Sequence, residues 1–282
     1  MIPLHDNIPS RRFPIVNYAM IAACTLVFLA QVGEREGDAS LVERYGMIPA
    51  RVLHPGEPIT VPSIEERIVD VPVRTPYGVE VVRMTREVVV ERPAANSAVP
   101  AILTLLTCIF LHGGWLHFLG NMWFLHIFGD NVEDRFGHLG YLAFYLLSGV
   151  AASAAHLAAG PDSQIPTIGA SGAIAGVMGA YMISYPHARV MTLVPIVYFM
   201  QMIVLPAPLF LGIWFAMQFF QGVAAIGDVS SGGVAWWAHI GGFAVGALAV
   251  FLLDRGHVLR ERNADIRPHT ERATVYRIGP RW

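Results

Sequence analysis

Four polar residues in apolar surroundings have the chemical types that serine catalysis needs. Ser171 lies in the sequence GASG and His239 in the sequence AHIGG, while His117 and Asn121 are four positions apart. On a helix, that spacing places His117 and Asn121 on one face. A hydroxyl, an imidazole that accepts its proton, and donors directed at a developing oxyanion are the groups used in acyl transfer. The four residues therefore form a candidate catalytic set.

The set lacks a carboxylate, so the sequence predicts a Ser–His dyad, in which packing must fix the imidazole tautomer that Asp fixes in a triad. The oxyanion donors would be the Asn121 amide, the His117 ring and the backbone N–H of Ser171 at a helix N-terminus. Small residues would let the Ser171 and His239 helices approach more closely than the usual ~8–10 Å. They form two GxxxG pairs, Gly172 with Gly176 and Gly242 with Gly246.

Each part of this set also has a purely structural interpretation. The GASG sequence alone is ordinary packing in a membrane helix, and His117 with Asn121 would serve as an interhelical hydrogen-bond pair. The combination on three separate segments favours catalysis. A metal site is not indicated, because the sequence has no HExxH motif and no carboxylate among the membrane histidines. Paired intramembrane aspartates are also absent, and no cofactor is implied.

The segments that must position these residues are predicted to span a membrane. The 282 residues are 54% hydrophobic and 14% charged, with a mean hydropathy of +0.50, which excludes an ordinary cytosolic enzyme. A net charge of −2 excludes a large basic surface for nucleic acid. Each uncharged stretch holds the ~20 residues that one span needs. These stretches are 13–33, 93–129, 136–161, 163–188, 190–227 and 229–253, so the prediction is an all-α polytopic protein with six transmembrane helices.

Two of the six stretches are too long for one span and too short for two. As single helices, 93–129 and 190–227 would each be roughly 55 Å long. In the first, residues 98–111 are expected near the outer interface, with the span starting around Trp115. In the second, three prolines break the helix and place the span near 207–223.

Arginines predict the orientation. All 19 basic residues are Arg, and outside the long first loop they fall on one side of the spans: Arg11, Arg12, Arg135, Arg189 and seven in the tail. Both termini are therefore expected to be cytoplasmic, in a cell (inner) membrane. The predicted organisation is a cytoplasmic N-terminus 1–12, a first span 13–33, a long external loop 34–97, five further helices in 98–254 and a cytoplasmic tail 255–282. Within the loop, two Val-rich strands in 68–90 predict a small β-hairpin.

The motifs and their order resemble the rhomboid intramembrane serine proteases. The matching elements are His117-x-x-x-Asn121, VEDRFG at 132–137, GASG at 169–172 and AHIGGxxxG at 238–246. The resemblance covers roughly 97–254 and the first span. It implies a six-helix rhomboid-like bundle that cleaves transmembrane protein substrates within the lipid bilayer.

The resemblance also assigns roles. It implies that Ser171 is the nucleophile, that His239 is its base, and that Asn121 and His117 support the oxyanion. Glu133 and Arg135 would be structural. Two positions depart from the pattern of some members: Ala175 replaces an aromatic residue that stacks under the base, and Leu103-Thr104 replaces a Trp-Arg pair. The alternative function is a non-catalytic rhomboid-like protein that binds or escorts membrane clients, and a small-solute transporter is more remote because the sequence has no charged midplane pathway.

Overall fold

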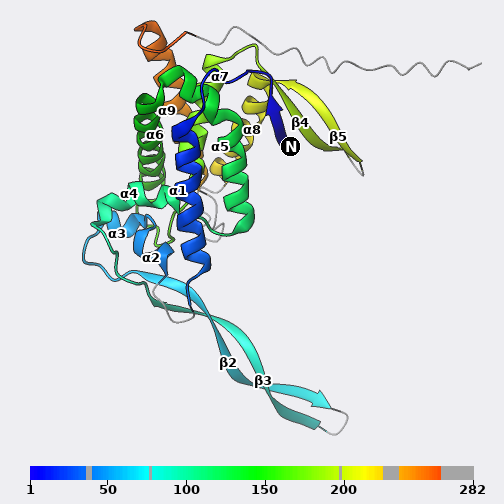
Figure 1. The fold of residues 1–282 in the computed structure, drawn as a ribbon. Coiled ribbons are helices and arrows are strands. Elements are labelled where there is room, and N and C mark those ends of the chain that lie inside the picture. Colours follow the sequence, from blue (N-terminus) through cyan, green and yellow to red (C-terminus); the bar gives the residue numbers. More distant parts are fainter. Residues whose placement is uncertain (36–39, 76–77, 197–198, 225–234, 262–282) are drawn as a thin grey trace, which may run out of the picture.

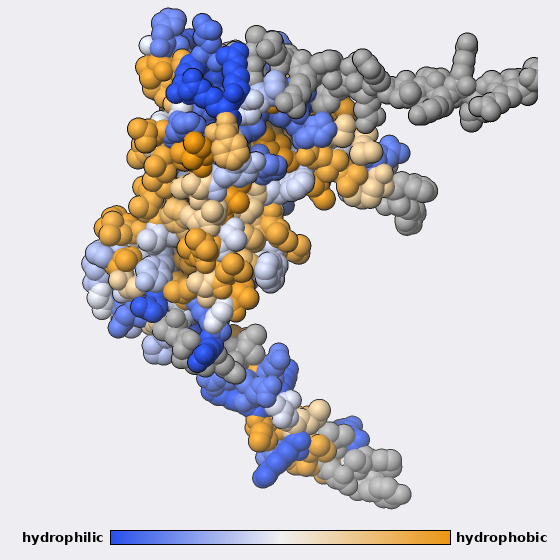
Figure 2. Space-filling model, in the orientation of Figure 1, coloured by the Kyte–Doolittle hydropathy of each residue, from blue (hydrophilic) through white to orange (hydrophobic). Residues whose placement is uncertain are grey.

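The computed structural model describes residues 1–35, 40–75, 78–196, 199–224 and 235–261. Figure 1 shows long helices packed side by side in a bundle, a long two-stranded sheet that leaves one end, and a shorter sheet beside the other end. The bundle consists of α1 (Ile15–Val32), α5 (Trp115–Phe136), α6 (His138–Ala159), α7 (Ser171–Ser184), α8 (Ala207–Ala224) and α9 (Trp236–Arg255). Figure 2 shows hydrophobic residues over the middle of this bundle and hydrophilic ones toward its ends.

The helices make this a multi-pass membrane protein. Among the described residues, α1, α6, α8 and α9 are long and apolar enough to cross a membrane. Segment 101–110 and α5 form a fifth candidate span if they are counted together, although the chain bends by 79° between them. The fourth predicted span, 163–188, contains α7, which has 14 residues and a length of only ~21 Å. The uncharged stretch 163–188 is longer than this helix, because residues 160–170 form a connection that is not helical.

The two long uncharged stretches divide where the sequence suggests. The first contains three short turns before α5, namely η1 (Ala101–Leu103), α4 (Thr104–Thr107) and η2 (Cys108–Phe110), and α5 then begins at Trp115. In the second stretch, α8 begins at Ala207. The preceding residues form a β-hairpin of β4 (Arg189–Ile196) and β5 (Phe199–Pro206), a structure that the apolar pattern alone does not indicate.

Helix α7, which begins at Ser171, lies at the centre of the bundle against α9. A Cβ atom added to Gly242 would lie 2.0 Å from the carbonyl oxygen of Gly172, and one added to Gly246 would lie 1.9 Å from that of Gly176. The two backbones are therefore in direct contact, as the GxxxG pairs predict. Every residue of α7 from Gly172 to Tyr181 is buried, so protein covers this part of the helix on all sides.

One end of the bundle, called here the Arg-rich end, is where α1 begins and where α5 and α9 end. Buried charged residues connect the helices there. Glu133 of α5 is 2% exposed and accepts hydrogen bonds from the backbone N–H groups of Val16 (3.0 Å) and Asn17 (2.7 Å), which begin α1. Arg135 is equally buried and pairs with Asp254 near the end of α9. These contacts agree with the structural roles that the resemblance implies for Glu133 and Arg135.

The shorter sheet lies at the same end and has the strand order β1-β4-β5, where β1 is Ile2–Asp6. Asp6 anchors β1 to the bundle: its carboxylate accepts hydrogen bonds from the Tyr181 hydroxyl and from Nδ2 of Asn131 at 3.0 Å. Burial raises the pKa of Asp6 to about 6.

At the opposite end, β2 (Thr60–Thr75) and β3 (Gly78–Pro93) pair antiparallel from Thr60↔Pro93 to Thr75↔Gly78. Both strands extend further toward the bundle than the Val-rich segments of the sequence. Two short helices, α2 (Leu41–Tyr45) and α3 (Pro49–Leu53), lie at the base of this sheet.

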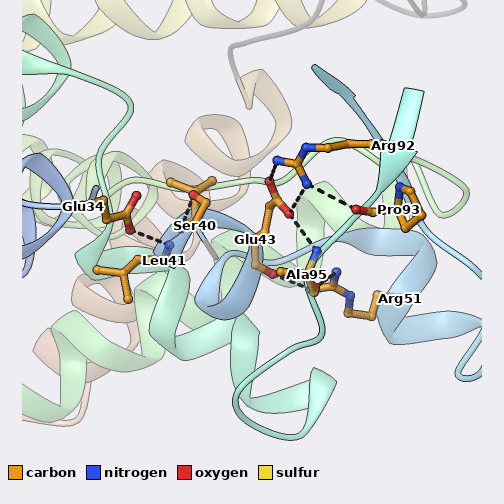
Figure 3. Close-up of polar contacts among 9 residues, drawn as sticks. Glu34, Ser40, Leu41, Glu43, Arg51, Arg92, Pro93 and Ala95 are labelled. Carbon is orange, nitrogen blue, oxygen red and sulfur yellow. Dashed lines mark hydrogen bonds and ion pairs between the residues drawn. The ribbon is translucent and has the colours of Figure 1, made fainter. Parts of the chain in front are cut away.

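A buried carboxylate holds together the segments where the β2–β3 sheet joins the bundle (Figure 3). Glu43 of α2 accepts hydrogen bonds from both terminal nitrogens of Arg92 (2.6 and 3.1 Å) and from the N–H of Ala95 (2.7 Å). Arg51 donates to the Glu43 carbonyl and, at 2.8 Å, to that of Ala95. Burial acts to raise the pKa of the Glu43 carboxyl, but the hydrogen bonds and the charge of Arg92 outweigh it and lower the pKa below its usual range.

Candidate active site

Ser171 is the first residue of α7 and follows a glycine that the local geometry requires. Gly169 has φ of +127°, a conformation that side chains with a Cβ rarely adopt. A Cβ at Gly169 would also lie 2.8 Å from the imidazole of His117. The small GASG sequence therefore lets the chain turn into α7 while His117 packs directly against the turn.

His239, in the first turn of α9, contacts Ser171. Its Nε2 lies 2.7 Å from Ser171 Oγ, a hydrogen-bonding distance. The side chain is 9% exposed, whereas Ser171 is only partly buried. The close packing of α7 on α9 brings these two residues together although they are 68 positions apart.

His117 and Asn121 lie on the first two turns of α5, beside the same site. Nδ1 of His117 accepts a hydrogen bond from the N–H of Gly113 at 3.2 Å, so the ring proton belongs on Nε2. The Nδ2 of Asn121 is buried and donates to no acceptor within the described part of the chain. Among the described residues, Asn121 Nδ2 is therefore available to a group that enters the cavity, and the His117 ring would present its Nε2–H there.

All four predicted residues line one cavity of about 550 Å³, although they come from three helices. Its wall also includes Leu116, Phe124, Ile174 and Met178, so most of the lining is apolar. A pocket with an apolar wall and a few convergent polar groups is a typical ligand or substrate site.

Gln218 of α8 is a fifth polar residue of this cavity, and it was not among the residues predicted from the sequence. Its Oε1 lies 2.6 Å from Nδ1 of His239, and the side chain is 8% exposed. An amide oxygen only accepts hydrogen bonds, so Nδ1 must carry the imidazole proton. Nε2 then has a free lone pair and accepts the Ser171 hydroxyl proton in its hydrogen bond. The available signal for this residue was an amide side chain in an apolar helix. That signal is ambiguous because Gln221 lies three positions further along. Only the packing of α8 shows which glutamine reaches His239.

Two indole rings add to the orientation of His239. The ring centroid of Trp214 lies 5.8 Å from that of His239 at an interplanar angle of 40°, and Trp236 lies 6.2 Å away, nearly perpendicular. The position that carries an aromatic residue in some rhomboids is Ala175, which is fully buried in α7. Here α8 and the start of α9 provide the groups that hold the imidazole.

A second buried histidine lies behind His117. His112 is 2% exposed, and its ring centroid is 5.4 Å from that of His117. Neither ring nitrogen of His112 has a hydrogen-bond partner among the described residues, and Phe28 and Phe118 pack against the ring edge-on. His112 therefore contributes to the packing that holds the His117 ring.

The fold and the site define a multi-pass membrane protein with a hydrogen-bonded Ser–His pair in the wall of a mostly apolar cavity. The model of the Rhomboid domain matches residues 100–256, more than half of the chain. The chain belongs to the rhomboid family.

Curated relatives agree with this assignment. The chain is 34% identical to RHOMBOID-like protein 4 of Arabidopsis thaliana over 176 residues, which cover 58% of this chain and 38% of the relative. It is 37% identical to RHOMBOID-like protein 5 over 78 residues (28% and 25%) and 38% identical to Rhomboid-like protein 11, chloroplastic, over 77 residues (27% of each), both from the same plant. The matches thus span about a quarter to two fifths of the relatives' own lengths.

Proposed function

We propose that this protein is an intramembrane serine endopeptidase that uses Ser171 and His239 as a catalytic dyad. The observation that carries the proposal is the continuous chain of hydrogen bonds from Ser171 Oγ to His239 Nε2 and from His239 Nδ1 to Gln218 Oε1. This arrangement leaves the imidazole in the tautomer that a general base requires. Family membership supports the same conclusion, because rhomboids are typically intramembrane proteases.

The proposed reaction has two stages. Ser171 Oγ attacks the carbonyl carbon of the substrate peptide bond while its proton moves to His239 Nε2. His239 then gives this proton to the leaving amine nitrogen, the C–N bond breaks, and an acyl-enzyme remains. A water molecule attacks the ester with His239 again as base, and the proton returns to Ser171 Oγ when the acid product leaves.

The negative charge on the oxygen of each tetrahedral intermediate needs hydrogen-bond donors to stabilise it. Nδ2 of Asn121, Nε2–H of His117 and the backbone N–H of Ser171 at the start of α7 are the groups that would supply them. The Asn121 Nδ2, which has no acceptor among the described residues, supports this role, because buried donors are normally hydrogen-bonded and one without an acceptor needs an explanation.

Gln218 would act as a positioning residue. We expect Gln218→Ala to lower kcat about 10-fold with little change in KM, because a neutral buried hydrogen bond contributes ~1 to 1.5 kcal/mol and holds the base rather than the substrate. Gln218→Glu should restore most of the rate, since a carboxylate oxygen accepts the same Nδ1–H. Gln221→Ala is the matched control and should leave kcat unchanged. A loss in Gln218→Ala that Gln218→Glu does not rescue would contradict the positioning role.

Substrates would be transmembrane segments of other proteins, cleaved in or just outside the bilayer. A helical peptide bond is masked by its own hydrogen bonds, so the cleaved segment should unwind easily. The direct test combines cleavage of a single-span substrate in proteoliposomes with labelling of the protein by a serine-directed fluorophosphonate. Labelling at Ser171 together with cleavage supports a protease. A folded protein that binds the substrate but gives neither result would favour the non-catalytic binder.

The orientation with both termini in the cytoplasm of a cell membrane is also part of the proposal. It follows from Arg11, Arg12, Arg135 and Arg189, which lie before α1, near the end of α5 and at the start of β4. Figure 1 shows these parts of the chain at the end of the bundle opposite the β2–β3 sheet. In a Cys24→Ala, Cys108→Ala background, a cysteine at Val81 should react with an impermeant maleimide in intact cells. A cysteine at Val258 should react only after lysis. The opposite pattern would place the Ser171 end of the bundle on the cytoplasmic side. The distal tail 262–282 lies outside the described residues.

A further inference from the structure

The β4–β5 hairpin at the Arg-rich end has an unusual distribution of side chains. Its two strands pair in register from Arg189↔Pro206 to Ile196↔Phe199. Directly paired residues share a face of the hairpin, and so do residues two positions apart in one strand. One face packs on the bundle: Val190 and Thr192 are fully buried, and Leu205 packs against the core. On the other face, the pair Arg189 and Pro206 comes first. The six residues beyond this pair, called here the outer hairpin face, are Met191, Leu193, Pro195, Met200, Met202 and Val204.

The outer hairpin face is apolar at all six positions and points away from the bundle. Met202 is 70% exposed and Met200 55%. A sheet with one face on the core normally has a polar face toward water. From Val190 to Pro206 the sequence contains no charged residue. Among the described residues of this stretch the exposed polar side chain is Gln201, and it lies on the opposite face.

The β2–β3 hairpin at the other end provides an internal comparison. It is an antiparallel hairpin that projects from the bundle, as β4–β5 is, but exposed charges recur along it, including Glu66, Arg67, Arg83 and Glu87. The same chain thus has one hairpin with exposed charges along its length and one without any charge between Val190 and Pro206. Figures 1 and 2 show the apolar hairpin projecting sideways from the bundle rather than continuing along the helix axes.

We propose that the outer hairpin face lies in the bilayer interface, between headgroups and acyl chains, beside the helical bundle. The bundle itself spans the membrane, so the lipid next to its Arg-rich end is the apolar medium within reach of a sideways projection. Exposed arginines mark the same end, among them Arg12, Arg189 and Arg255, and would face lipid phosphates. This proposal does not depend on the catalytic one.

The backbone limits how deep the hairpin inserts. The strand order β1-β4-β5 leaves one edge of β5 unpaired by any other described strand. Open sheet edges are not found in the hydrocarbon core, because their peptide groups need water. The side chains of the outer hairpin face therefore enter the acyl boundary, as in interfacial amphipathic helices, while the β5 edge stays at the hydrated headgroup level.

The test places a fluorescent probe on each hairpin of the full chain. Starting from Cys24→Ala, Cys108→Ala, we would label Met202→Cys with an environment-sensitive dye and use Val81→Cys, 65% exposed on the β2–β3 hairpin, as the matched control. Both proteins are placed in nanodiscs of phosphatidylcholine and phosphatidylglycerol, where each face is open to solvent. Met200→Cys provides a second probe on the outer hairpin face.

A lipid with a nitroxide near the top of its acyl chain should quench the Met202 and Met200 probes severalfold more than the Val81 probe. Aqueous iodide should give the reverse order. Equal iodide quenching of the probes on both hairpins would overturn the proposal, because the face would then be in water. Protection from both quenchers would also overturn it, since a protein partner such as a second copy of the chain would then cover the face.

Discussion

Replacement of Ser171 by alanine is expected to reduce cleavage of a reconstituted transmembrane substrate to background, a fall on the order of 10⁵-fold or more. The variant removes the hydroxyl that lies 2.7 Å from His239 Nε2 and leaves the α7–α9 contact unchanged. Initial rates in proteoliposomes, with thermal unfolding of the same samples, measure the effect. Ser184→Ala is the matched control: this serine is fully buried on the same helix, at its other end, and should leave the rate unaltered.

His239→Ala should be about as damaging, and the double variant should be no worse than either single one. Residues that act as one catalytic unit are strongly non-additive. If Ser171→Ala cleaved at the wild-type rate, the dyad would have to be abandoned. Losses that multiplied in the double variant would instead indicate that the two residues act independently.

Replacement of Asn121 by alanine is expected to lower kcat by ~10² to 10³, which is the cost of losing one oxyanion donor. KM should change little, because the amide would bind the charge that develops in the transition state rather than the ground-state carbonyl. The ground for this expectation is the buried Nδ2, which finds no acceptor among the residues that the structure describes.

Asn17→Ala provides the matched control for that variant. Asn17 is another buried amide in a membrane helix, but its Nδ2 donates to the carbonyl of Leu125 and its Oδ1 accepts from Tyr141. The Asn17→Ala variant should have a lower thermal stability than the wild type and a kcat close to that of the wild type. An Asn121→Ala protein that behaved like Asn17→Ala would show that Asn121 is a structural hydrogen-bonding residue.

The sequence was sufficient to collect the four candidate residues because each lies near the start of a helix and the three helix starts face one end of the bundle. It could also place the beginning of α5 at Trp115 and of α8 at Ala207, where uncharged length and prolines limit the choices. These inferences use length, charge and spacing, which are local properties of the chain.

Other features depend on contacts that the sequence does not display. Gln218 reaches His239 only because of the rotation of α8 against α9, and no spacing rule relates residues on different helices. The segment 189–206 is as apolar as a membrane span, and its strand pairing becomes evident only when β1 is found beside β4. The length of α7 was overestimated because an uncharged connection and a helix look alike in hydropathy.

The enclosure of α7 has a consequence for how the protein responds to membranes of different thickness. Hydrophobic mismatch acts on lipid-facing helices, which tilt or distort the bilayer around them. The helix that carries Ser171 is short and, from Gly172 to Tyr181, covered by other helices. Its contact with α9 through Gly242 and Gly246 is between backbones and has no side-chain freedom to adjust. Thickness changes should therefore alter how the outer helices tilt, while the spacing between Ser171 and His239 stays fixed.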